Sequence, residues 1–155
     1  MASPRFSLSL SCAVLAGVGS LILGVPMATA QPAAESVDSL LATADTTAGQ
    51  RTGRICMSCH TINKGGATRI GPNLWNIVNR PVGQVTGFHY SAAFKKITAK
   101  TWSYDSLNTW LYSPPSEAPG TAMAYGGIKK TQDRANVIAW LRTLSDSPAP
   151  LPKIK

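Results

Sequence analysis

Five consecutive residues constrain this chain more than any other feature of it: Cys56-Met57-Ser58-Cys59-His60. Cys-x-x-Cys-His is the pattern at which a c-type haem is attached. Two thiols three residues apart on a helical turn lie on the same side of it, so both can form thioether bonds to one haem. The histidine that follows can then bind the iron through one ring nitrogen, while its other N–H fixes the ring orientation. The motif therefore predicts one covalently attached haem c per chain.

Three other uses of the cysteine pair are weaker interpretations. A redox pair of the thioredoxin type would follow a strand in a βαβ unit, but no strand-like alternation flanks residues 50–62. A structural zinc site needs four nitrogen or sulfur ligands, and outside the motif the sequence offers only His89 as a further histidine. A structural disulfide between Cys56 and Cys59 is the third alternative.

The first thirty residues have the pattern of a secretory signal peptide. Arg5 precedes an uncharged, apolar stretch over 6–26, and Ala28-Thr29-Ala30 forms an A-x-A cleavage site. We therefore expect residues 1–30 to be removed and the chain to work in the periplasm. The alternative is an uncleaved anchor that would hold the protein at the membrane. Cleavage would also remove Cys12 and leave the two motif cysteines as the remaining thiols, which suits an oxidising compartment.

The charge of the chain points to acidic partners. Its formal net charge is +8, and the basic residues are scattered rather than clustered in one run. Such a balance favours association with an acidic protein surface. We do not expect nucleic acid as a partner, because an exported haem protein would seldom meet it.

The rest of the sequence indicates a small all-α domain, because no segment after residue 30 shows convincing strand alternation. We predict a flexible leader over 31–47, several short helices wrapped around the haem over 48–146, and a disordered, proline-rich tail over 147–155. The expected helices lie at about 48–59, from Pro72 to Val78, from Ser91 to Ile97, from Ser103 or Asp105 to before Pro114, and from an N-cap at Thr131 to about Asp146.

A second iron ligand is expected in the long aperiodic stretch from Pro114 to Lys130, which contains Met123. Long loops in compact domains are usually functional, and a methionine thioether is an established axial ligand of haem iron. Met57 lies inside the haem motif, so Met123 is the methionine left to approach the opposite face. A methionine that only fills the core and ligation by His89 are the alternatives.

The stretch 48–146 resembles the class I c-type cytochromes, in particular the branch that holds mitochondrial cytochrome c and its bacterial relatives. The resemblance rests on matches in the family's order: Cys56-Met-Ser-Cys59-His60, Gly71-Pro72-Asn73-Leu74, Gly87-Phe88-x-Tyr90, Trp102, Pro119-Gly120-Thr121-x-Met123 and Trp140-Leu141. It implies that the Pro72 carbonyl accepts the His60 N–H, and that Arg80, Tyr90 and Trp102 surround a buried haem propionate. An anionic carboxylate inside a protein needs such charge-assisted donors.

The resemblance implies a one-electron carrier rather than an enzyme. We expect a monomer with its iron between His60 and Met123, docking on acidic faces of membrane or periplasmic redox proteins. Lysines of the mitochondrial docking ring are missing at Pro115, Ser116 and Ala122, so other basic residues would serve: Lys64, Arg69, Lys95 and Lys96. Two rivals stay open. One is a haem peroxidase or ligand sensor with a labile Met123, and the other is an electron-transfer module of a membrane enzyme complex.

Overall fold

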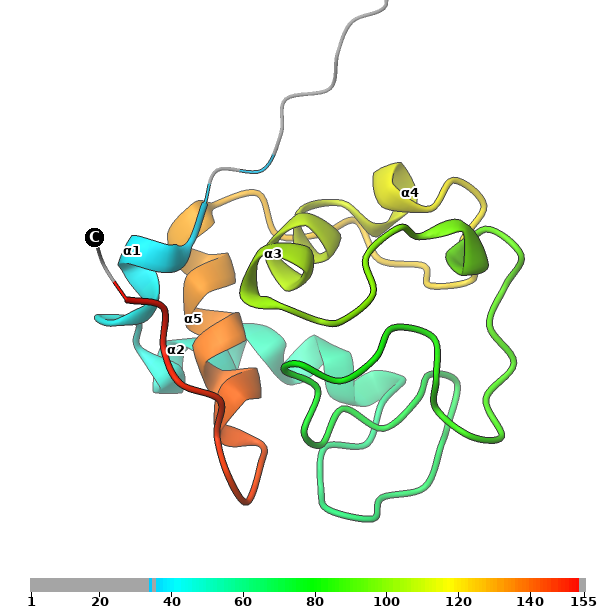
Figure 1. Ribbon diagram of the computed structural model, residues 1–155, viewed down its shortest axis with the longest axis horizontal. Coiled ribbons are helices and arrows are strands. Elements are labelled where there is room, and N and C mark those ends of the chain that lie inside the picture. The colour runs from blue at the N-terminus through cyan, green and yellow to red at the C-terminus, as the bar shows by residue number, and fades with distance from the viewer. Residues whose placement is uncertain (1–33, 35, 154–155) are drawn as a thin grey trace, which may run out of the picture. The chain divides into compact units, whose positions relative to one another are not determined.

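The computed structural model describes residue 34 and residues 36–153, so the signal-peptide prediction for 1–30 lies outside it. Its helices, shown in Figure 1, are α1 (Asp38–Leu41), α2 (Thr46–Gly53), the 3-10 helices η1 (Arg54–Ser58) and η2 (Phe94–Lys96), α3 (Tyr104–Tyr112), α4 (Pro114–Glu117) and α5 (Thr131–Thr143). The described residues form no strand beyond one isolated bridge between Pro81 and Thr101. The all-α prediction is confirmed.

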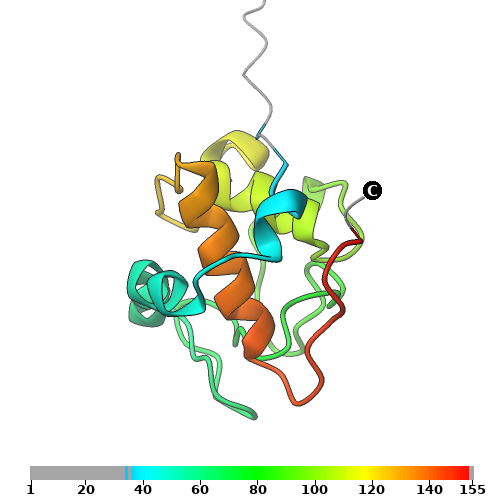
Figure 2. The same cartoon turned by 90° about the vertical axis from the view of Figure 1, so that its left-hand side faces the viewer.

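Helix α5 is the central element of the domain, and α1, α2 and α3 all pack against it (Figures 1 and 2). Its residues from Arg134 to Leu141 are buried. The α2 contact depends on small residues: a Cβ built on Gly53 would lie 2.6 Å from Trp140 Cε3, and one built on Gly49 would lie 3.0 Å from Trp140 Cβ. Glycine weakens an isolated helix, so close packing against α5 stabilises α2 in place of intrinsic propensity.

The helix that carries the haem motif changes type within the motif region. Asp45 caps α2, since its Oδ1 accepts hydrogen bonds from the backbone N–H groups of Thr47 (2.8 Å) and Ala48 (3.0 Å). The α-helix ends at Gly53 and continues as the 3-10 helix η1. We predicted one helix over 48–59, which is close to the combined span of α2 and η1. The change to a 3-10 helix was not predicted.

No helix forms after Pro72, contrary to the prediction from Leu74, Ile77 and Val78. Asn73 Oδ1 instead accepts the Trp75 N–H at 2.8 Å, which turns the chain locally. Asn76 and Asn79 have positive φ angles of 55° and 65°, a left-handed conformation that interrupts a right-handed helix. The two apolar residues between them, Ile77 and Val78, are buried all the same.

The structure refines three further predictions. Ser103, rather than Asp105, caps α3, and the stretch expected as one loop over 114–130 contains the short helix α4. The predicted helix at 91–97 is reduced to the single turn η2, with Ser91 Oγ accepting the Phe94 N–H at 3.1 Å.

Both ends of the described chain are folded, which corrects two of our predictions. The leader predicted over 31–47 contains α1, and its Val37 and Leu41 are 0% and 3% exposed in the core. In the tail predicted to be disordered over 147–155, the Ala149 carbonyl accepts hydrogen bonds from Arg142 Nε (2.5 Å) and Tyr104 Oη (3.2 Å). Within the part of the chain described here, no helix has both the length and the apolar character to cross a lipid bilayer.

Candidate functional site

His60 is held by the backbone of the loop that follows it. Its Nδ1 lies 2.6 Å from the Pro72 carbonyl oxygen. A carbonyl can only accept, so Nδ1 carries the hydrogen and Nε2 keeps its lone pair. Burial lowers the pKa of His60, the Pro72 bond raises it in part, and the Arg80 charge lowers it further. The ring is therefore a neutral imidazole with one nitrogen ready to bind a metal.

The two thiols of the motif are half-buried and carried by one short segment. The backbone N–H groups of Cys59 and His60 both bond to the Cys56 carbonyl, at 3.2 and 2.9 Å. Residues three apart eclipse in a 3-10 turn, so Cys56 and Cys59 lie on the same side of the chain. Burial raises the pKa of the Cys56 thiol, and the neighbouring Cys59 raises it further against a backbone hydrogen bond that lowers it.

Hydrogen bonds to backbone carbonyls of the motif hold the loop 61–74 against it. The Gly71 N–H donates to the Cys59 carbonyl at 2.9 Å, and Arg69 Nη1 donates to the Met57 carbonyl at 3.0 Å. Gly71 has a role that we did not predict. A Cβ built there would lie 2.6 Å from His60 Nδ1 and 2.8 Å from Nε2, so only glycine leaves room for the imidazole ring. Its place in the Gly71-Pro72-Asn73-Leu74 match was the signal available in the sequence.

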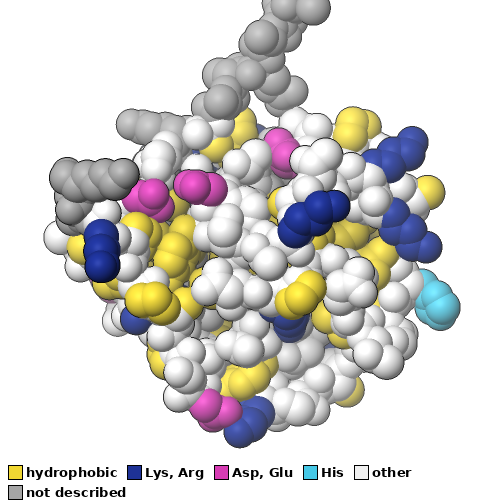
Figure 3. Space-filling view, in the orientation of Figure 1, with side chains coloured by type: hydrophobic (Ala, Val, Ile, Leu, Met, Phe, Trp, Pro, Cys, Tyr) yellow, Lys and Arg dark blue, Asp and Glu magenta, His cyan; other side chains and the backbone are white. Residues whose placement is uncertain are grey.

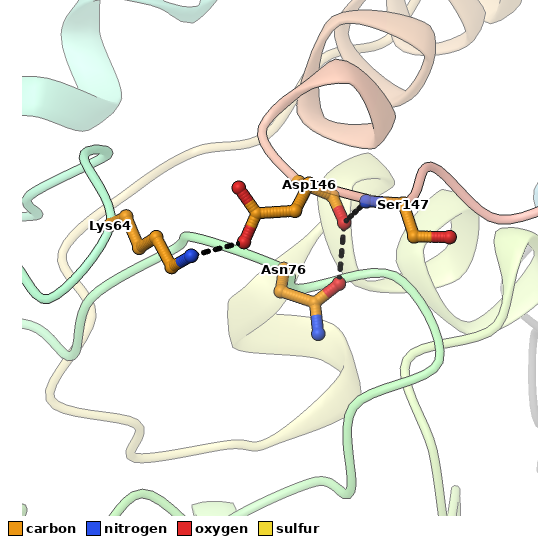
Figure 4. A network of polar contacts seen from close by, with 5 residues as sticks. Lys64, Asn76, Asp146 and Ser147 are labelled. Carbon is orange, nitrogen blue, oxygen red and sulfur yellow. Dashed lines mark hydrogen bonds and ion pairs between the residues drawn. The ribbon is translucent and has the colours of Figure 1, made fainter.

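A second connection links this loop to the end of α5 (Figure 4). Lys64 Nζ lies 2.6 Å from Asp146 Oδ2, and Ser145 Oγ donates to Asn76 Oδ1 at 2.9 Å. The backbone N–H of Asn76 also donates to the Leu144 carbonyl at 2.6 Å. The segments on both sides of Pro72 are thus tied to the central helix.

Arg80 is a half-buried cation whose hydrogen bonding is incomplete. Its Nη1 donates to the Trp75 carbonyl at 3.0 Å, while its Nε is buried with no hydrogen-bond partner. Burial lowers the pKa of Arg80, and the nearby Tyr90 raises it in part. A buried donor on a charged group is costly when left unpaired, so this position fits an anionic group such as a carboxylate.

An aromatic cluster surrounds the predicted propionate donors Tyr90 and Trp102. The Tyr90 ring stacks on Phe94 with centroids 4.7 Å apart, and Phe94 and Trp110 pack against Trp102 at 6.2 and 5.8 Å. Trp102 is buried, and the Tyr90 hydroxyl accepts a 3.4 Å hydrogen bond from the Val85 N–H. The cluster supplies an apolar wall of the kind a haem ring requires.

Met123 lies half-buried against the core. Its N–H donates to Thr121 Oγ1 at 3.3 Å, and the Ile128 N–H donates to the Leu111 carbonyl at 2.7 Å. Burial raises the pKa of Tyr125, and the nearby Cys56 raises it further. His89, the other candidate ligand, is exposed.

The residues present fit a covalently bound haem. They offer two thiols on one side of a turn, a neutral imidazole, a half-buried thioether and a half-buried guanidinium whose Nε lacks a hydrogen-bond partner. Among the residues from 36 to 153, no three His, Cys, Asp or Glu side chains gather into a metal-binding group, so the zinc interpretation gains no support there.

Comparison with known proteins identifies relatives. The family model for cytochrome c matches residues 47–145. A cytochrome c homolog of Bradyrhizobium diazoefficiens is 44% identical over 124 residues, covering 79% of this chain and 67% of that protein. The cytochrome c homolog of Rickettsia prowazekii is 41% identical over 107 residues, which cover 69% of this chain and 61% of that protein. The cytochrome c-type cyt cy of Rhodobacter capsulatus is 40% identical over 114 residues, which cover 73% of this chain and 56% of that protein. This chain thus spans about two thirds of these relatives or less.

Proposed function

This chain belongs to the cytochrome c family, and from that premise we propose that it carries single electrons between redox proteins with its haem iron bound by His60 and Met123. The family binds haem c covalently, and here the motif that accepts it is Cys56-Met57-Ser58-Cys59-His60. When bound, haem c supplies an iron that alternates between the ferric and ferrous states. The observation that carries the proposal is the 2.6 Å contact between His60 Nδ1 and the Pro72 carbonyl, which leaves Nε2 for the metal.

Cys56 and Cys59 would form the two thioether bonds, and His60 would supply the first axial nitrogen. The Pro72 carbonyl holds the ring and increases the electron donation of the other nitrogen, which is a recurring role of groups that bond to metal-binding histidines. Gly71 keeps the space beside the ring open. Together these residues would hold the ligand in one orientation, so little reorganisation would accompany a change of oxidation state.

Met123 is the best candidate for the second ligand. Among the described residues the methionines are Met57 and Met123, and Met57 lies inside the motif. Hydrogen bonds at Thr121 and Ile128 support the Met123 segment, and Cys56 raises the pKa of its neighbour Tyr125. Thioether ligation raises the reduction potential relative to two histidines. With both axial positions filled, small molecules would find no open site, which suits a carrier rather than a peroxidase or a sensor.

Arg80, Tyr90 and Trp102 would serve the haem propionates. The unpartnered Nε of Arg80 is the donor best suited to a carboxylate oxygen, because a guanidinium binds carboxylates through charge-assisted hydrogen bonds. Tyr90 raises the pKa of Arg80 in part, which supports a shared role for the two side chains. The apolar rings of Phe94, Trp102 and Trp110 would keep water from the macrocycle.

The partners we propose are acidic faces of redox proteins met after export. No Asp or Glu occurs between Asp45 and Asp105, while that segment carries these basic residues: Arg51, Arg54, Lys64, Arg69, Arg80, Lys95, Lys96 and Lys100. Toward the right-hand edge of the face in Figure 3, the charged side chains in view are Lys and Arg. Such a surface speeds encounters with acidic partners, and raising the ionic strength should slow electron transfer.

Two measurements test the proposal. Mass spectrometry of protein exported from a host that attaches haem should report a covalent adduct on the peptide that contains Cys56 and Cys59, together with the first residue after cleavage. Replacing Met123→Ala should abolish the far-red band of the ferric protein and lower its midpoint potential, with the haem still attached. Met57→Leu is the matched control and should keep both properties.

Opposite results would redirect the assignment. A colourless exported protein would contradict the haem site itself. A far-red band that survives in Met123→Ala would move the second ligand to another residue. Rapid loss of the band from the unmodified protein on adding cyanide would favour the peroxidase or sensor alternative.

A further inference from the structure

The stretch that carries Met123 lies between two buried residues. Ala118 and Ile128 are 1% and 8% exposed, and residues 119–127, the Met123 segment, connect them. Within the segment, the Tyr125 N–H donates to the Met123 carbonyl at 2.9 Å, which is a local turn. The position of Met123 in the domain therefore depends on how the two ends are held, as well as on its own contacts with the core.

The end at Ile128 packs tightly against the C-terminal end of α3. The Ile128 N–H donates to the Leu111 carbonyl at 2.7 Å, and a Cβ built on Gly127 would lie 2.9 Å from the same carbonyl oxygen. Gly127 has a φ angle of 86°, a conformation that favours glycine. Figure 1 shows the chain between α4 and α5 passing behind α3. The backbones of these two parts of the chain are therefore in direct contact.

Arg134 of α5 also holds this end of the segment. Its side chain is 1% exposed, and its Nη1 donates to the carbonyls of Ile128 (2.9 Å) and Lys129 (2.8 Å). Its Nε donates to Asn108 Oδ1 of α3 at 2.7 Å, and its guanidinium carbon lies 5.1 Å from the centroid of the Tyr112 ring. One buried cation thus joins the end of the Met123 segment to both α3 and α5.

A buried guanidinium is stable only while hydrogen bonds compensate for the water that it has lost. The carbonyls of Ile128 and Lys129 supply part of that compensation, so movement of this end away from Arg134 is costly. The planar guanidinium donates in several fixed directions at once, which the ammonium of a lysine does not reproduce. We propose that Arg134 is a positioning residue for the second iron ligand, because it holds residues 128 and 129 and thereby keeps Met123 in place. The part of this inference that concerns the iron rests on the proposed function.

Amide hydrogen exchange of the reduced holoprotein, followed by NMR, tests the positioning directly. In Arg134→Lys the N–H groups of Met123 and Tyr125 should exchange about tenfold faster or more, the loss expected for one charge-assisted contact. Leu41→Ala is the matched control, because it opens a cavity at a buried position of α1 and lowers global stability outside the segment. The two amides should keep their rates in this control, since a loop exchanges through local opening. Unchanged exchange in Arg134→Lys, or equal acceleration in both variants, would overturn the proposal.

Cyanide binding to the ferric holoprotein tests the link to the iron. At saturating cyanide the rate is set by departure of the methionine, so Arg134→Lys should bind cyanide about tenfold faster or more. Leu41→Ala should bind it at the rate of the unmodified protein. The double variant of Met123→Ala and Arg134→Lys should bind no faster than Met123→Ala alone, because no thioether is left to position. Faster amide exchange without faster cyanide binding would rule out the effect of Arg134 on the ligand.

Asn108→Ala is a milder second variant, because it leaves Arg134 in the chain and removes the oxygen that accepts its Nε–H. It should accelerate amide exchange and cyanide binding in the same direction, by a smaller factor. If Arg134→Lys yields no folded holoprotein, unchanged rates in Asn108→Ala would contradict the proposal. Absence of the far-red band from the unmodified ferric protein would instead contradict the proposed Met123 ligand. The exchange experiment would still decide whether Arg134 positions the Met123 segment, so the two failures are distinguishable.

Discussion

Replacing Gly71→Ala would test whether the fit between this residue and His60 holds the proposed iron ligand. The backbone of Gly71 is buried and bonded to the Cys59 carbonyl at 2.9 Å, so it cannot move away freely. The added methyl carbon would lie 2.6 Å from His60 Nδ1 and 2.8 Å from Nε2, well inside van der Waals contact. Either the ring or the loop must shift.

The size of the effect follows from two terms. Forcing an extra methyl group into a packed site costs about 1–3 kcal/mol. If the ring shifts, the 2.6 Å bond to the Pro72 carbonyl is strained or lost, which removes roughly 0.5–1.5 kcal/mol more. We therefore expect the free energy of unfolding of the holoprotein to fall by about 2–4 kcal/mol.

Denaturant unfolding of the ferric holoprotein, followed by circular dichroism, measures this loss. NMR of the reduced protein reports the His60 Nδ1–H resonance and thus the Pro72 bond directly. Gly126→Ala is a matched control, because no atom lies within 4 Å of its added Cβ and its φ angle is not positive. Equal stability of the two variants, with an unchanged Nδ1–H resonance, would refute the claim that Gly71 makes room for the ring.

Three smaller predictions concern the contacts around the end of α5. Lys64→Met should change the free energy of unfolding by less than about 1 kcal/mol in denaturant titrations, because Lys64 and Asp146 have side chains 69% and 64% exposed. Tyr104→Phe should cost roughly 1 kcal/mol and speed proteolysis after residue 146, since the bonds to the tail carbonyls are lost. Burial raises the pKa of Tyr104, although Arg142 lowers it in part. The contribution of the neutral phenol to stability is therefore present below the usual tyrosine pKa and is lost as the pH rises through the raised value. A spectroscopic alkaline titration should show one phenol that deprotonates at higher pH than an ordinary tyrosine.

The sequence indicates the haem-attachment motif more clearly than it indicates the contacts that hold the motif in place. Cys56, Cys59 and His60 could be identified because haem attachment needs those residue types at that spacing. The buried face of α5 could be identified because Val137, Ile138 and Leu141 recur with helical periodicity. Both signals are local, so neither depends on how distant parts of the chain meet.

The missed features depend on contacts between residues far apart in the sequence. Asn76 and Asn79 take left-handed backbone conformations where the apolar spacing favoured a helix, and Asn76 does so while bonded to the carbonyl of Leu144. Local propensity was outweighed there by a tertiary contact, which a periodicity argument does not include.

The prediction of a disordered C-terminal tail was wrong for the same reason, because it did not include contacts with distant residues. Its prolines at 148, 150 and 152 exclude a regular helix, and we equated the absence of a helix with disorder. A segment without secondary structure is nevertheless ordered when its carbonyls find donors, and here Tyr104 and Arg142 supply them to Ala149. Those donors belong to α3 and α5, so the conformation of the tail depends on contacts with both helices. In a chain with few and short helices, bonds between side chains and backbone therefore take the place of regular structure around the site, and composition alone does not reveal them.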